Sequence, residues 1–277
     1  KNRPGGMRPA VSAGSSAEQN EHPLRKWRVA EKMSVVESSD VTDLPLPDPA
    51  ISIVIPTLNE AGAVESRLAA LAPLRAAGAE IILVDGGSGD ATADLAQPLC
   101  DRIIIAPRGR AGQMNAGAAV ASGDILLFLH LDTALPAGAR DSVQAGLAAS
   151  ARCWGRFDVR ILGAHPLLTV VAALMNLRSR MTGIATGDQA IFVTREAFRR
   201  AGGFPLQPLM EDIALSKALK RQSPPLCLRA KVSTSGRRWD RHGFWRTVLL
   251  MWRLRLAYSL GGDPAKLALA YGYASDG

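Results

Sequence analysis

His130 and Asp132 stand two positions apart at the end of an apolar run, and their side chains are suited to binding a cation or an anionic ligand. The run, residues 125–129, is typical of a strand that is buried on both faces. Side chains two positions apart on a strand point to the same side, so the imidazole and the carboxylate converge at its carboxyl end. Open α/β sheets bind ligands at that edge, and a divalent cation that carries phosphates needs such a carboxylate. The alternative is that Asp132 caps the turn before Pro136 and that His130 packs inside.

A second set of polar residues follows another predicted strand, residues 80–84, which closes on Asp85. The turn 85–92 is rich in glycine, which would let a ligand approach the backbone. Arg108 and Arg110 lie in a loop at the same edge, where Arg110 would neutralise a diphosphate. The sequence contains neither the glycine fingerprint of dinucleotide-binding domains nor a Walker A motif. Each glycine-rich turn also fits an ordinary surface turn, and only the order and spacing of the signals together favour a nucleotide site.

Apolar segments of strand length recur every 20 to 30 residues and alternate with helical patterns. The predicted strands are residues 51–58, 80–84, 102–106 and 125–129, with later ones at 155–161, which alternates like a half-exposed strand, and 187–193. Asn59 is predicted to cap the first helix and Gly78 to end it. The alternation favours parallel pairing through right-handed crossovers. The predicted fold class is therefore α/β, with a mostly parallel central sheet flanked by helices.

Composition and charge narrow the class of protein. With 277 residues, 47% of them apolar and 21% charged, the chain suits a soluble globular protein of one large or two small domains. The net charge is +8, and the segment 227–258 alone carries eight basic residues against one acid. Such a segment suits an anionic partner such as a nucleotide diphosphate, a membrane surface or nucleic acid, although solvated surface charge is the alternative. The three cysteines lack metal-site spacing and favour reduced thiols in a cytosolic protein.

Two segments differ from the regular pattern. Residues 1–48 are rich in Ser, Gly, Pro and charge, and we expect them to be largely disordered. Residues 166–180 are apolar with a basic end, which fits either an amphipathic helix at a membrane interface or a plain core helix. No apolar run reaches the roughly 18–20 residues of a membrane span.

The order of these motifs resembles the family 2 glycosyltransferases of the GT-A fold. The matching pieces are IVIPTLNE, VDGGSGDAT, GRAGQMNAGAAVASGDILLFLHLDTALP, GDQAIFVTREAFRRAGGFP and MEDIALSKALK. They fall within residues 51–257, and their combination is specific although no single motif is. The H-x-D sequence around Asp132 is similar to that of a bacterial subgroup described as associated with arsenosugar biosynthesis or radical-SAM enzymes.

The resemblance implies a GT-A domain over residues 49–260, with a nucleotide-binding half at 49–136 and an acceptor half with a basic tail at 137–260. Residues 261–277 are left as a C-terminal tail. The implied donor-binding residues are Pro56, Thr57, Glu60, Asp85, Arg110, Asp132, Arg237 and Trp239. The implied acceptor-side residues are Gly187, Asp188 and Glu211, and the implied catalytic base is Asp212.

The chemistry of glycosyl transfer also supports a role for the Asp212 carboxylate, because the reaction needs a base that takes the proton of the acceptor hydroxyl. Neighbouring residues on a helix diverge by about 100°, so only one of Glu211 and Asp212 is expected to point into the site. The alternative is that both acids only favour the positive N-terminal end of the helix.

The sequence departs from the family pattern at two positions. His130 stands where the family's D-x-D motif has its first aspartate, and histidine can ligate Mn²⁺ but suits Mg²⁺ poorly. The predicted cation, Mn²⁺ or Mg²⁺, would thus be held by Asp132, with His130 as an uncertain ligand. Gly86 stands where many relatives carry an additional aspartate.

The leading hypothesis is a bacterial, inverting, metal-assisted glycosyltransferase of the hexosyltransferase class that uses a nucleotide-diphosphate sugar and an unidentified acceptor. No nucleic acid partner is expected. The expected location is the cytoplasm, with peripheral contact to an anionic inner-membrane face. The alternatives are a sugar-nucleotide nucleotidyltransferase, which would need a basic glycine-rich loop after the first strand, and a non-catalytic protein that binds a ligand or a membrane surface.

Overall fold

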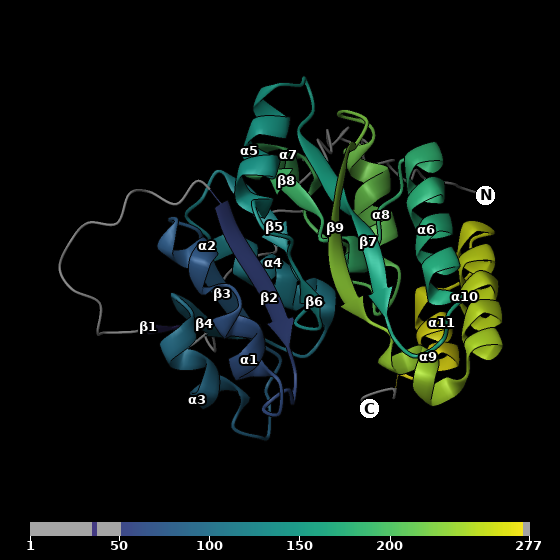
Figure 1. Cartoon of the computed structure of the whole chain (residues 1–277), viewed down its shortest axis with the longest axis horizontal. Coiled ribbons are helices and arrows are strands. Elements are labelled where there is room, and N and C mark those ends of the chain that lie inside the picture. Colours follow the sequence, from purple (N-terminus) through teal and green to yellow (C-terminus); the bar gives the residue numbers. More distant parts are fainter. Residues whose placement is uncertain (1–34, 38–50, 274–277) are drawn as a thin grey trace, which may run out of the picture.

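The computed structural model describes residues 35–37 and 51–273, so most of the extension predicted to be disordered lies outside the described residues. The described part contains one mixed sheet with the strand order β1-β4-β3-β2-β5-β8-β7-β9-β6 (Figure 1). The strands are β1 (Val35–Glu37), β2 (Ile51–Thr57), β3 (Glu80–Asp85), β4 (Arg102–Ile105), β5 (Ile125–Phe128), β6 (Thr133–Ala134), β7 (Trp154–Leu162), β8 (Phe192–Thr194) and β9 (Leu226–Ser235).

The centre of the sheet is parallel, as the sequence predicts. Strands β4, β3, β2 and β5 pair in parallel, and β2 and β3 are buried along nearly all of their length. Strand β8 then runs antiparallel to both β5 and β7, while β7 and β9 form a long parallel pair. The predicted α/β class is confirmed: a sheet with a parallel centre is flanked by helices and followed by C-terminal helices (Figure 1).

Helices cover both faces of this sheet. They are α1 (Val64–Ala69), α2 (Ala72–Ala76), α3 (Thr92–Ala96), α4 (Arg110–Val120), α5 (Ala139–Ala148), α6 (Leu168–Thr182), α7 (Arg195–Ala201), α8 (Glu211–Leu219), α9 (Arg237–His242), α10 (Phe244–Ser259) and α11 (Pro264–Tyr271). The single helix predicted before Gly78 is divided into α1 and α2, and Gly78, with φ 88°, follows the end of α2. The prediction for Asn59 is wrong: its φ is 52°, and its side chain accepts a hydrogen bond from the Gly89 N–H at 2.9 Å. Asn59 therefore braces a loop and does not begin a helix.

Three strand predictions in the second half need correction. Residues 187–189 form a 3-10 turn with a capping box, and strand β8 begins only at Phe192. Strand β7 was expected to be half exposed, but its first six residues are buried because both β8 and β9 pair with it. Strand β9 was not predicted, since its residues alternate between basic and apolar types without a sustained buried run.

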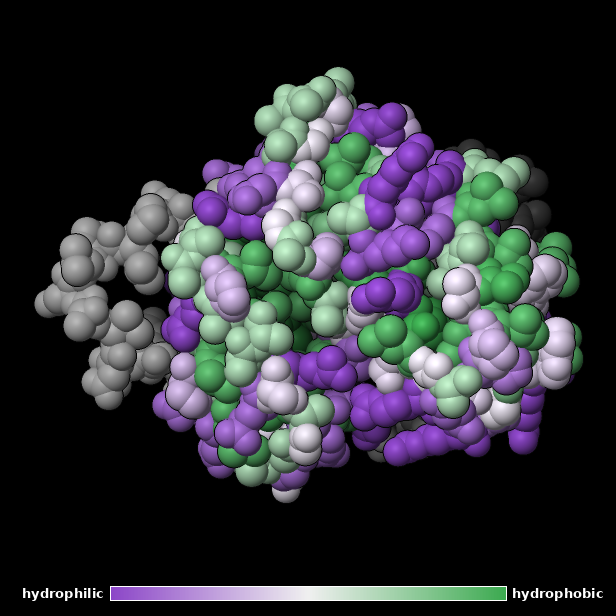
Figure 2. Space-filling model, viewed as in Figure 1, coloured by the Kyte–Doolittle hydropathy of each residue, from purple (hydrophilic) through white to green (hydrophobic). Residues whose placement is uncertain are grey.

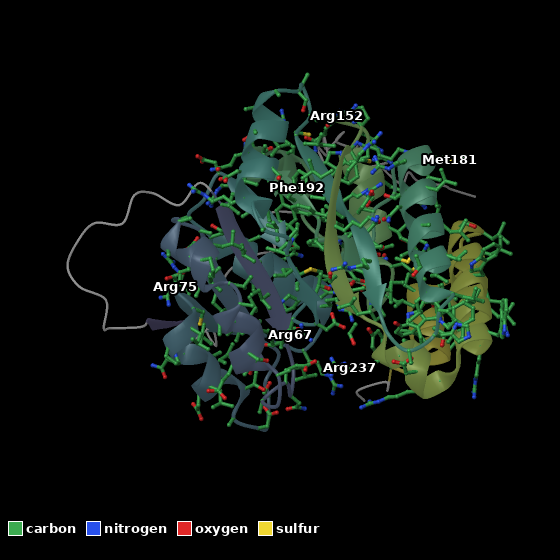
Figure 3. All side chains as sticks on the ribbon, viewed as in Figure 1. Arg67, Arg75, Arg152, Met181, Phe192 and Arg237 are labelled. Carbon is green, nitrogen blue, oxygen red and sulfur yellow. The ribbon has the colours of Figure 1, made fainter. Side chains whose placement is uncertain are left out.

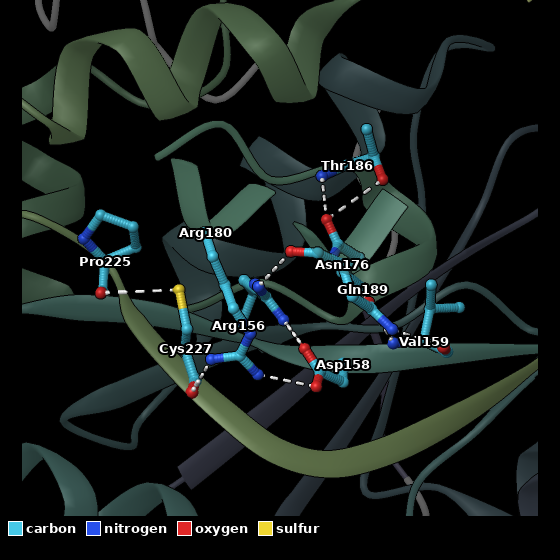
Figure 4. A network of polar contacts seen from close by, with 9 residues as sticks. All are labelled: Arg156, Asp158, Val159, Asn176, Arg180, Thr186, Gln189, Pro225 and Cys227. Atoms are coloured by element: carbon cyan, nitrogen blue, oxygen red, sulfur yellow. Dashed lines mark hydrogen bonds and ion pairs between the residues drawn. The ribbon is translucent and has the colours of Figure 1, made fainter. Parts of the chain in front are cut away.

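A buried polar network joins α6 to β7 (Figure 4). Arg156 is fully buried, and its guanidinium donates to Asp158 and to the carbonyl of Asn176. Arg180 donates to the second Asp158 oxygen at 2.7 Å. The Asp158 carboxylate thus lies between two guanidinium groups, which is the compensation that a buried charge requires.

The same network continues to the segment that follows α6 (Figure 4). The Asn176 side chain accepts from the Val159 N–H at 2.9 Å and donates to the Val159 carbonyl at 3.0 Å. Gln189 donates to Asn176 at 3.4 Å and accepts from the Thr186 N–H at 3.2 Å. Gly187 and Asp188, two of the predicted site residues, are therefore held between residues fixed to the sheet.

The C-terminal residues form more structure than the predicted tail. Helix α11 packs against α10, and both Leu254 and Ala268 are buried where they meet. Tyr273 accepts a hydrogen bond from Arg110 at 2.8 Å, so the chain returns to the edge of the sheet. Among the helices of residues 51–273, none has both the length and the apolar character needed to cross a membrane.

Candidate active site

The loops that follow β2 and β3 are tied together at one edge of the sheet. The N–H of Asn59 donates to the Ser88 hydroxyl at 2.8 Å, and the N–H of Glu60 donates to the Thr92 hydroxyl at 2.8 Å. The Ala61 N–H donates to the Asp90 carboxylate at 3.2 Å. Because parallel strands end at the same edge, these loops form one wall of the region where His130 and Asp132 also lie.

Asp85 supports its own turn. It is 2% exposed and accepts hydrogen bonds from the backbone N–H groups of Gly87 and Ser88 and from the Ser88 hydroxyl. Thr57 is also buried, while Pro56 is half-buried beside it. Asp85 and Thr57 therefore shape the wall of the region, and the role of each of them toward a nucleotide stays a prediction.

Gln113 on α4 was missed by the sequence analysis. Its side-chain amide donates to the carbonyls of Thr57 and Val84, each at 2.8 Å, and so ties the ends of β2 and β3 together. A Cβ at Gly86 would lie 3.1 Å from the same amide nitrogen. The glycine thus leaves room for this contact, which gives Gly86 a structural reason in place of the aspartate of many relatives.

Glu60, Asp132 and Arg237 gather on the open side of this edge. Burial raises the pKa of Glu60, the carboxylates of Asp132 and Asp90 raise it further, and Arg237 opposes them. Figure 3 shows Arg237 at the same edge of the molecule as Arg67, below the ends of the strands. The structure therefore brings together three of the predicted donor-binding residues, two acidic and one basic.

Trp239 lies apart from these residues. Its ring packs against Phe244 at 5.8 Å between centroids and contributes to the main hydrophobic core. Arg238, which the sequence analysis did not single out, donates to the Tyr271 carbonyl at 2.7 Å and stacks on the Tyr271 ring at 3.7 Å. Trp239 therefore supports α9 and α10 through the core.

His130 and Asp188 meet across the site. The His130 Nδ1 lies 3.7 Å from the Asp188 carboxylate, and the ring covers Gly187 so closely that a Cβ there would lie 2.5 Å from Nε2. Burial raises the pKa of Asp188, but the hydrogen bond and charge of His130, together with Arg110, hold that pKa below its usual value. The imidazole thus faces the acceptor-side segment.

Asp212 occupies the start of α8 and is fixed by backbone groups. One carboxylate oxygen accepts from the Gly187 N–H at 2.8 Å and the other from the Ile213 N–H at 2.7 Å. Burial raises its pKa above the ordinary value of 3.8, and the neighbouring Asp188 adds to this effect, while the two N–H groups and Arg110 oppose it. A carboxyl group with a raised pKa is a better general base near neutral pH.

Glu211 is buried beside Asp212. Its carboxylate lies 3.8 Å from Arg110 Nη1, and its pKa is raised by burial and by the charge of Asp212. Both acids border one small pocket, so the expectation that only one of them points into the site is wrong. Met210 has a φ of 65°, and this left-handed residue turns the chain immediately before the two acids. The pocket is lined by Met114, Phe128, His130, Gly187, Phe204, Glu211 and Asp212, among others.

Arg110 begins α4 and is not part of a loop as predicted. Its guanidinium contacts the Tyr273 hydroxyl and the Glu211 carboxylate, which come from two distant parts of the chain. This position, between the nucleotide half and the acidic pair, allows Arg110 to offset negative charge on either side.

Arg178 on α6 is a further residue that the sequence analysis missed. Its Nε and Nη2 atoms are buried and have no hydrogen-bond partner among the described residues. Burial lowers the pKa of Arg178 and Arg156 lowers it further, while the charge of Asp212 raises it. Two guanidinium nitrogens without a partner in the described part of the chain, in a group whose pKa is affected by Asp212, mark this side of the site as a place where a further polar group could bind.

A divalent cation would find few protein ligands here. Among residues 51–273, no three His, Cys, Asp or Glu side chains come together as a metal site would require. His130 faces Asp188, so Asp132 is left as the single carboxylate at the predicted metal position. A cation that takes its other ligands from a diphosphate and water needs only one or two carboxylates, and Asp132 meets this requirement.

A protein-family model matches part of the first half of the chain. Residues 52–149, about a third of the chain, match the model of Glycosyl transferase family 2. This segment contains the loops after β2, β3 and β5 that form the predicted nucleotide half. Residues 52–149 are therefore similar to the glycosyltransferase family 2 domain, whereas the H-x-D subgroup is not confirmed by these matches.

The curated relatives are mycobacterial. The "PGL/p-HBAD biosynthesis glycosyltransferase" of Mycobacterium bovis BCG and its counterpart in Mycobacterium tuberculosis H37Rv are each 40% identical over 94 residues. The match covers 31% of this chain and 37% of each relative. The chain therefore spans well under half the length of the curated relatives it matches.

Solved structures of glycosyltransferases share the fold. Mannosyltransferase PcManGT from Pyrobaculum calidifontis, in complex with GDP-Man and Mn²⁺, matches with TM-score 0.53 and 19% identity over 91% of this chain and 76% of its own. Staphylococcus aureus TarS 1-349 in complex with UDP-GlcNAc matches with TM-score 0.54 and 15% identity over 67% and 58%. Glucosyl-3-phosphoglycerate synthase from M. tuberculosis, in complex with Mn²⁺ and UDP, matches with TM-score 0.51 and 20% identity over 67% and 71%. At these identities the structures establish the GT-A fold alone.

Proposed function

We propose that this protein transfers a glycosyl group from a nucleotide-diphosphate sugar to an acceptor hydroxyl with inversion, and that Asp212 is the general base. The observation that carries the proposal is the position of Asp212. Its carboxylate is held by two backbone N–H groups, borders the pocket between the halves of the domain and has a raised pKa.

The proposed reaction is a single displacement. The acceptor oxygen attacks the anomeric carbon while its proton passes to the Asp212 carboxylate. The bond from that carbon to the diphosphate oxygen breaks, and the oxygen leaves with the electron pair as the nucleoside diphosphate. Because attack and departure occur on opposite faces of the sugar, the configuration inverts. The departing diphosphate is negatively charged. We assign the neutralisation of this charge to Arg110 and Arg237.

The donor is proposed to bind along the loops after β2 and β3, with Pro56, Thr57, Glu60 and Asp85 bordering the nucleoside. A divalent cation is proposed to bind the diphosphate through Asp132, as Mn²⁺ accompanies UDP or GDP-Man in two of the structures that share the fold. The cation would supply positive charge to the leaving group. Gly187, Asp188 and Glu211 are proposed to border the acceptor, and Trp239 is proposed to support the diphosphate end indirectly through α9.

The proposal also covers the transferred group and the location of the protein. The transferred group is proposed to be a hexosyl group, and the protein is proposed to act in the cytoplasm of a bacterium. Its three cysteines are free thiols, as a reducing compartment would keep them.

The test is transfer by Asp212→Asn, measured by release of nucleoside diphosphate from a panel of UDP- and GDP-sugars in the presence of a mixed acceptor extract. We expect at least a hundredfold loss of transfer with nucleotide affinity changed by less than about threefold, because the base acts only in the chemical step. The matched control is Asp141→Asn on α5. It makes the same chemical change at an exposed position, and its rate of transfer should equal that of the wild type. Retention of a tenth of wild-type transfer by Asp212→Asn would exclude Asp212 as the base.

Binding and hydrolysis of the donor separate transfer from the alternatives. Titration of the full chain with UDP and GDP, each with Mn²⁺ and with EDTA, should show binding to one nucleotide that weakens in EDTA. A catalytic site is expected to hydrolyse its sugar nucleotide slowly without acceptor. Binding without any hydrolysis or transfer would favour the non-catalytic alternative.

A further inference from the structure

Helices α6 and α10 expose an apolar surface that the proposed transfer reaction does not use. Eleven of the thirteen large apolar side chains that are exposed among the described residues lie on α6, α10 and α11 or on the residues that cap them. Figure 2 shows hydrophobic side chains gathering at this end of the molecule. They are Leu167, Val170, Leu174, Leu177, Met181, Trp245, Leu249, Trp252, Leu256, Leu260 and Leu269, and together they are named here the α6–α10 face.

The spacing on α10 places its exposed apolar residues in one stripe. Trp245, Leu249, Trp252 and Leu256 follow one another at intervals of three or four residues, which keeps them within about 60° on a helix. Trp245 is 65% exposed and Trp252 is 71% exposed. Side chains of this size are rarely left in water in such a row, so the stripe indicates a surface that binds something.

The inner sides of both helices are already packed. Leu168 and Ala172 of α6 and Phe244 of α10 are buried in one core cluster, and His165 stacks on Phe244 at 4.1 Å between ring centroids. The two helices therefore lie side by side with their outer stripes on the same end of the protein (Figure 1). Figure 3 shows Met181, at the end of α6, pointing outward. The exposed residues are thus additional to those that stabilise the fold.

The charged residues of α10 and α11 all have one sign. These helices contain no acidic residue, and they carry Arg246, Arg253, Arg255 and Lys266. On α6, Arg178 is partly buried near Asp212 and Arg180 is paired with Asp158, so neither belongs to this set. On α10, Arg246 and Arg253 lie about 80–120° from Trp245 and Trp252 in one direction, while Arg255 lies on the other side of the stripe. A row of tryptophan and leucine bordered by arginines is the pattern of helices that lie in the interface of an anionic bilayer.

We propose that the α6–α10 face docks on an anionic lipid bilayer. The tryptophan rings and leucine side chains enter the boundary between head groups and acyl chains, where amphipathic rings are stabilised. The arginines beside them contact the lipid phosphates. A second copy of this chain would bring the arginines of two α6–α10 faces together. The charge therefore favours lipid over self-association.

This proposal stands apart from the transfer reaction, and its test reads binding alone. The full chain is mixed with vesicles of phosphatidylcholine containing phosphatidylglycerol, or with vesicles of phosphatidylcholine alone, and the vesicles are floated on a density gradient. We expect the protein to float with the anionic vesicles and to stay largely in solution with the neutral ones. Binding should weaken steeply as salt is added, because charges near a membrane surface are screened.

Two pairs of variants separate the apolar and the charged contributions. Trp252→Glu with Leu249→Glu should abolish flotation. Arg246→Gln with Arg253→Gln should weaken it roughly 30-fold, since each arginine near an anionic surface contributes about a fivefold factor. The matched control is Arg199→Gln with Arg200→Gln on α7, which removes the same charge from another exposed helix and should change flotation less than threefold.

Light scattering of the same samples shows whether a second copy of the chain, and not lipid, covers the α6–α10 face. A monomer that floats with anionic vesicles, and whose tryptophan emission shifts to the blue on binding, supports the proposal. The proposal is overturned if the wild-type chain remains in solution with anionic vesicles. It is equally overturned if the chain is a dimer that Trp252→Glu with Leu249→Glu converts to a monomer, because the α6–α10 face would then be covered by a second copy.

Discussion

The environment of Asp212 acts on its charged form in two opposite ways. Two N–H groups stabilise the charged form, as they must if the group is to accept a proton during the reaction. Burial and the neighbouring acidic side chain destabilise the same form. The result is a base whose proton affinity exceeds that of an ordinary aspartate while its orientation is fixed. Such a balance is typical of groups that take part in proton transfer.

The raised pKa of Asp212 predicts the pH dependence of transfer. A base must be deprotonated to act, so the rate at low substrate should rise as pH increases through the pKa of Asp212, which lies above the ordinary value of 3.8. We expect the acid limb of the kcat/KM profile to lie above that value. The same shift means that the folded state binds the proton more tightly than the unfolded state does, so this carboxyl group lowers stability as pH rises through the same window. The profile is measured from about pH 3 to pH 9 by release of nucleoside diphosphate, and an acid limb below 3.8 would contradict the assignment.

Gly187 is a second residue whose replacement should affect the site more than the fold. In Gly187→Ala the new methyl group would meet the His130 ring, with Nε2 at 2.5 Å, so the ring must move away from Asp188. Because the Gly187 N–H also holds Asp212, we expect transfer to fall at least tenfold, while the free energy of unfolding changes by less than about 1 kcal/mol. Transfer assays and urea unfolding measure the two effects. Gly112→Ala on α4 is the control, because a Cβ there would lie 3.9 Å from the nearest heavy atom, and its transfer rate should stay within twofold.

At this scale the sequence indicates types of residue better than it indicates contacts. Asp132 and Asp85 could be singled out because each follows an apolar run, and that pattern depends only on neighbours in the chain. The contacts of Gln113, Tyr273 and Arg178 join elements that are far apart in sequence. No local pattern marks a glutamine or a tyrosine for such a contact, so these residues could not have been predicted.

At the scale of elements, α4 offers a matched pair of glycines. Gly117 faces β2 and β3, where an added Cβ would collide with Val54 and lie 2.8 Å from Val84. Gly112 lies in the same helix, and its Cβ would be 3.9 Å from the nearest heavy atom, which belongs to Leu206. Alanine is favoured over glycine in a helix by up to about 1 kcal/mol, whereas overpacking a core costs about 1–3 kcal/mol.

We therefore expect opposite effects from the same chemical change. Gly112→Ala should raise the free energy of unfolding by up to about 1 kcal/mol, and Gly117→Ala should lower it by about 1–2 kcal/mol because the overpacking outweighs the helix preference. Urea unfolding monitored by circular dichroism measures both variants against the wild type. Two changes of the same sign would show that the helix does not approach β2 and β3 as closely as the structure places it.

The elements differ in how clearly the sequence marks them. Strands β2, β3, β4 and β5 were predicted within a residue or two, because a strand buried on both faces has a continuous apolar run. Strand β9 pairs with β7 and β6 but has basic residues along its exposed side, so its sequence resembles a loop. Residues 187–189 look like the start of a strand, yet Thr186 and Gln189 close a capping box that overrides the preference.

At the scale of the whole molecule, the two halves of the domain meet at the acidic pair and Arg110. Arg110 belongs to the half that matches family 2, whereas Glu211 and Tyr273 come from beyond residue 149, where the family match ends. The C-terminal helices therefore complete the edge of the site while their outer surface forms the α6–α10 face. The sequence predicts only a tail for residues 261–277, because no local pattern marks the contact of Tyr273 with Arg110, which lies 163 positions earlier.

The link between Tyr273 and Arg110 gives a prediction at this scale. Tyr273→Phe removes the hydroxyl that accepts from the Arg110 guanidinium at 2.8 Å and leaves the ring in edge contact with the Tyr271 ring. The hydrogen bond is exposed, so we expect less than about 1 kcal/mol of lost stability. Arg110 would then be held by Glu211 alone and drawn toward the acceptor side, and we expect nucleoside diphosphate binding to weaken by about threefold to tenfold.

Calorimetric titration with UDP and GDP measures this effect. Tyr258→Phe is the matched control, because its hydroxyl accepts from Gln207 at 3.2 Å away from the Arg110 guanidinium. If Tyr273→Phe binds nucleotide as the wild type does while Arg110→Ala does not, the arginine acts without help from the C-terminal segment. If both variants bind as the wild type does, the positive charge at the donor diphosphate must come from Arg237 and the cation at Asp132. Weakening in Tyr273→Phe alone, with Tyr258→Phe unchanged, would make the C-terminal segment a working part of the donor site.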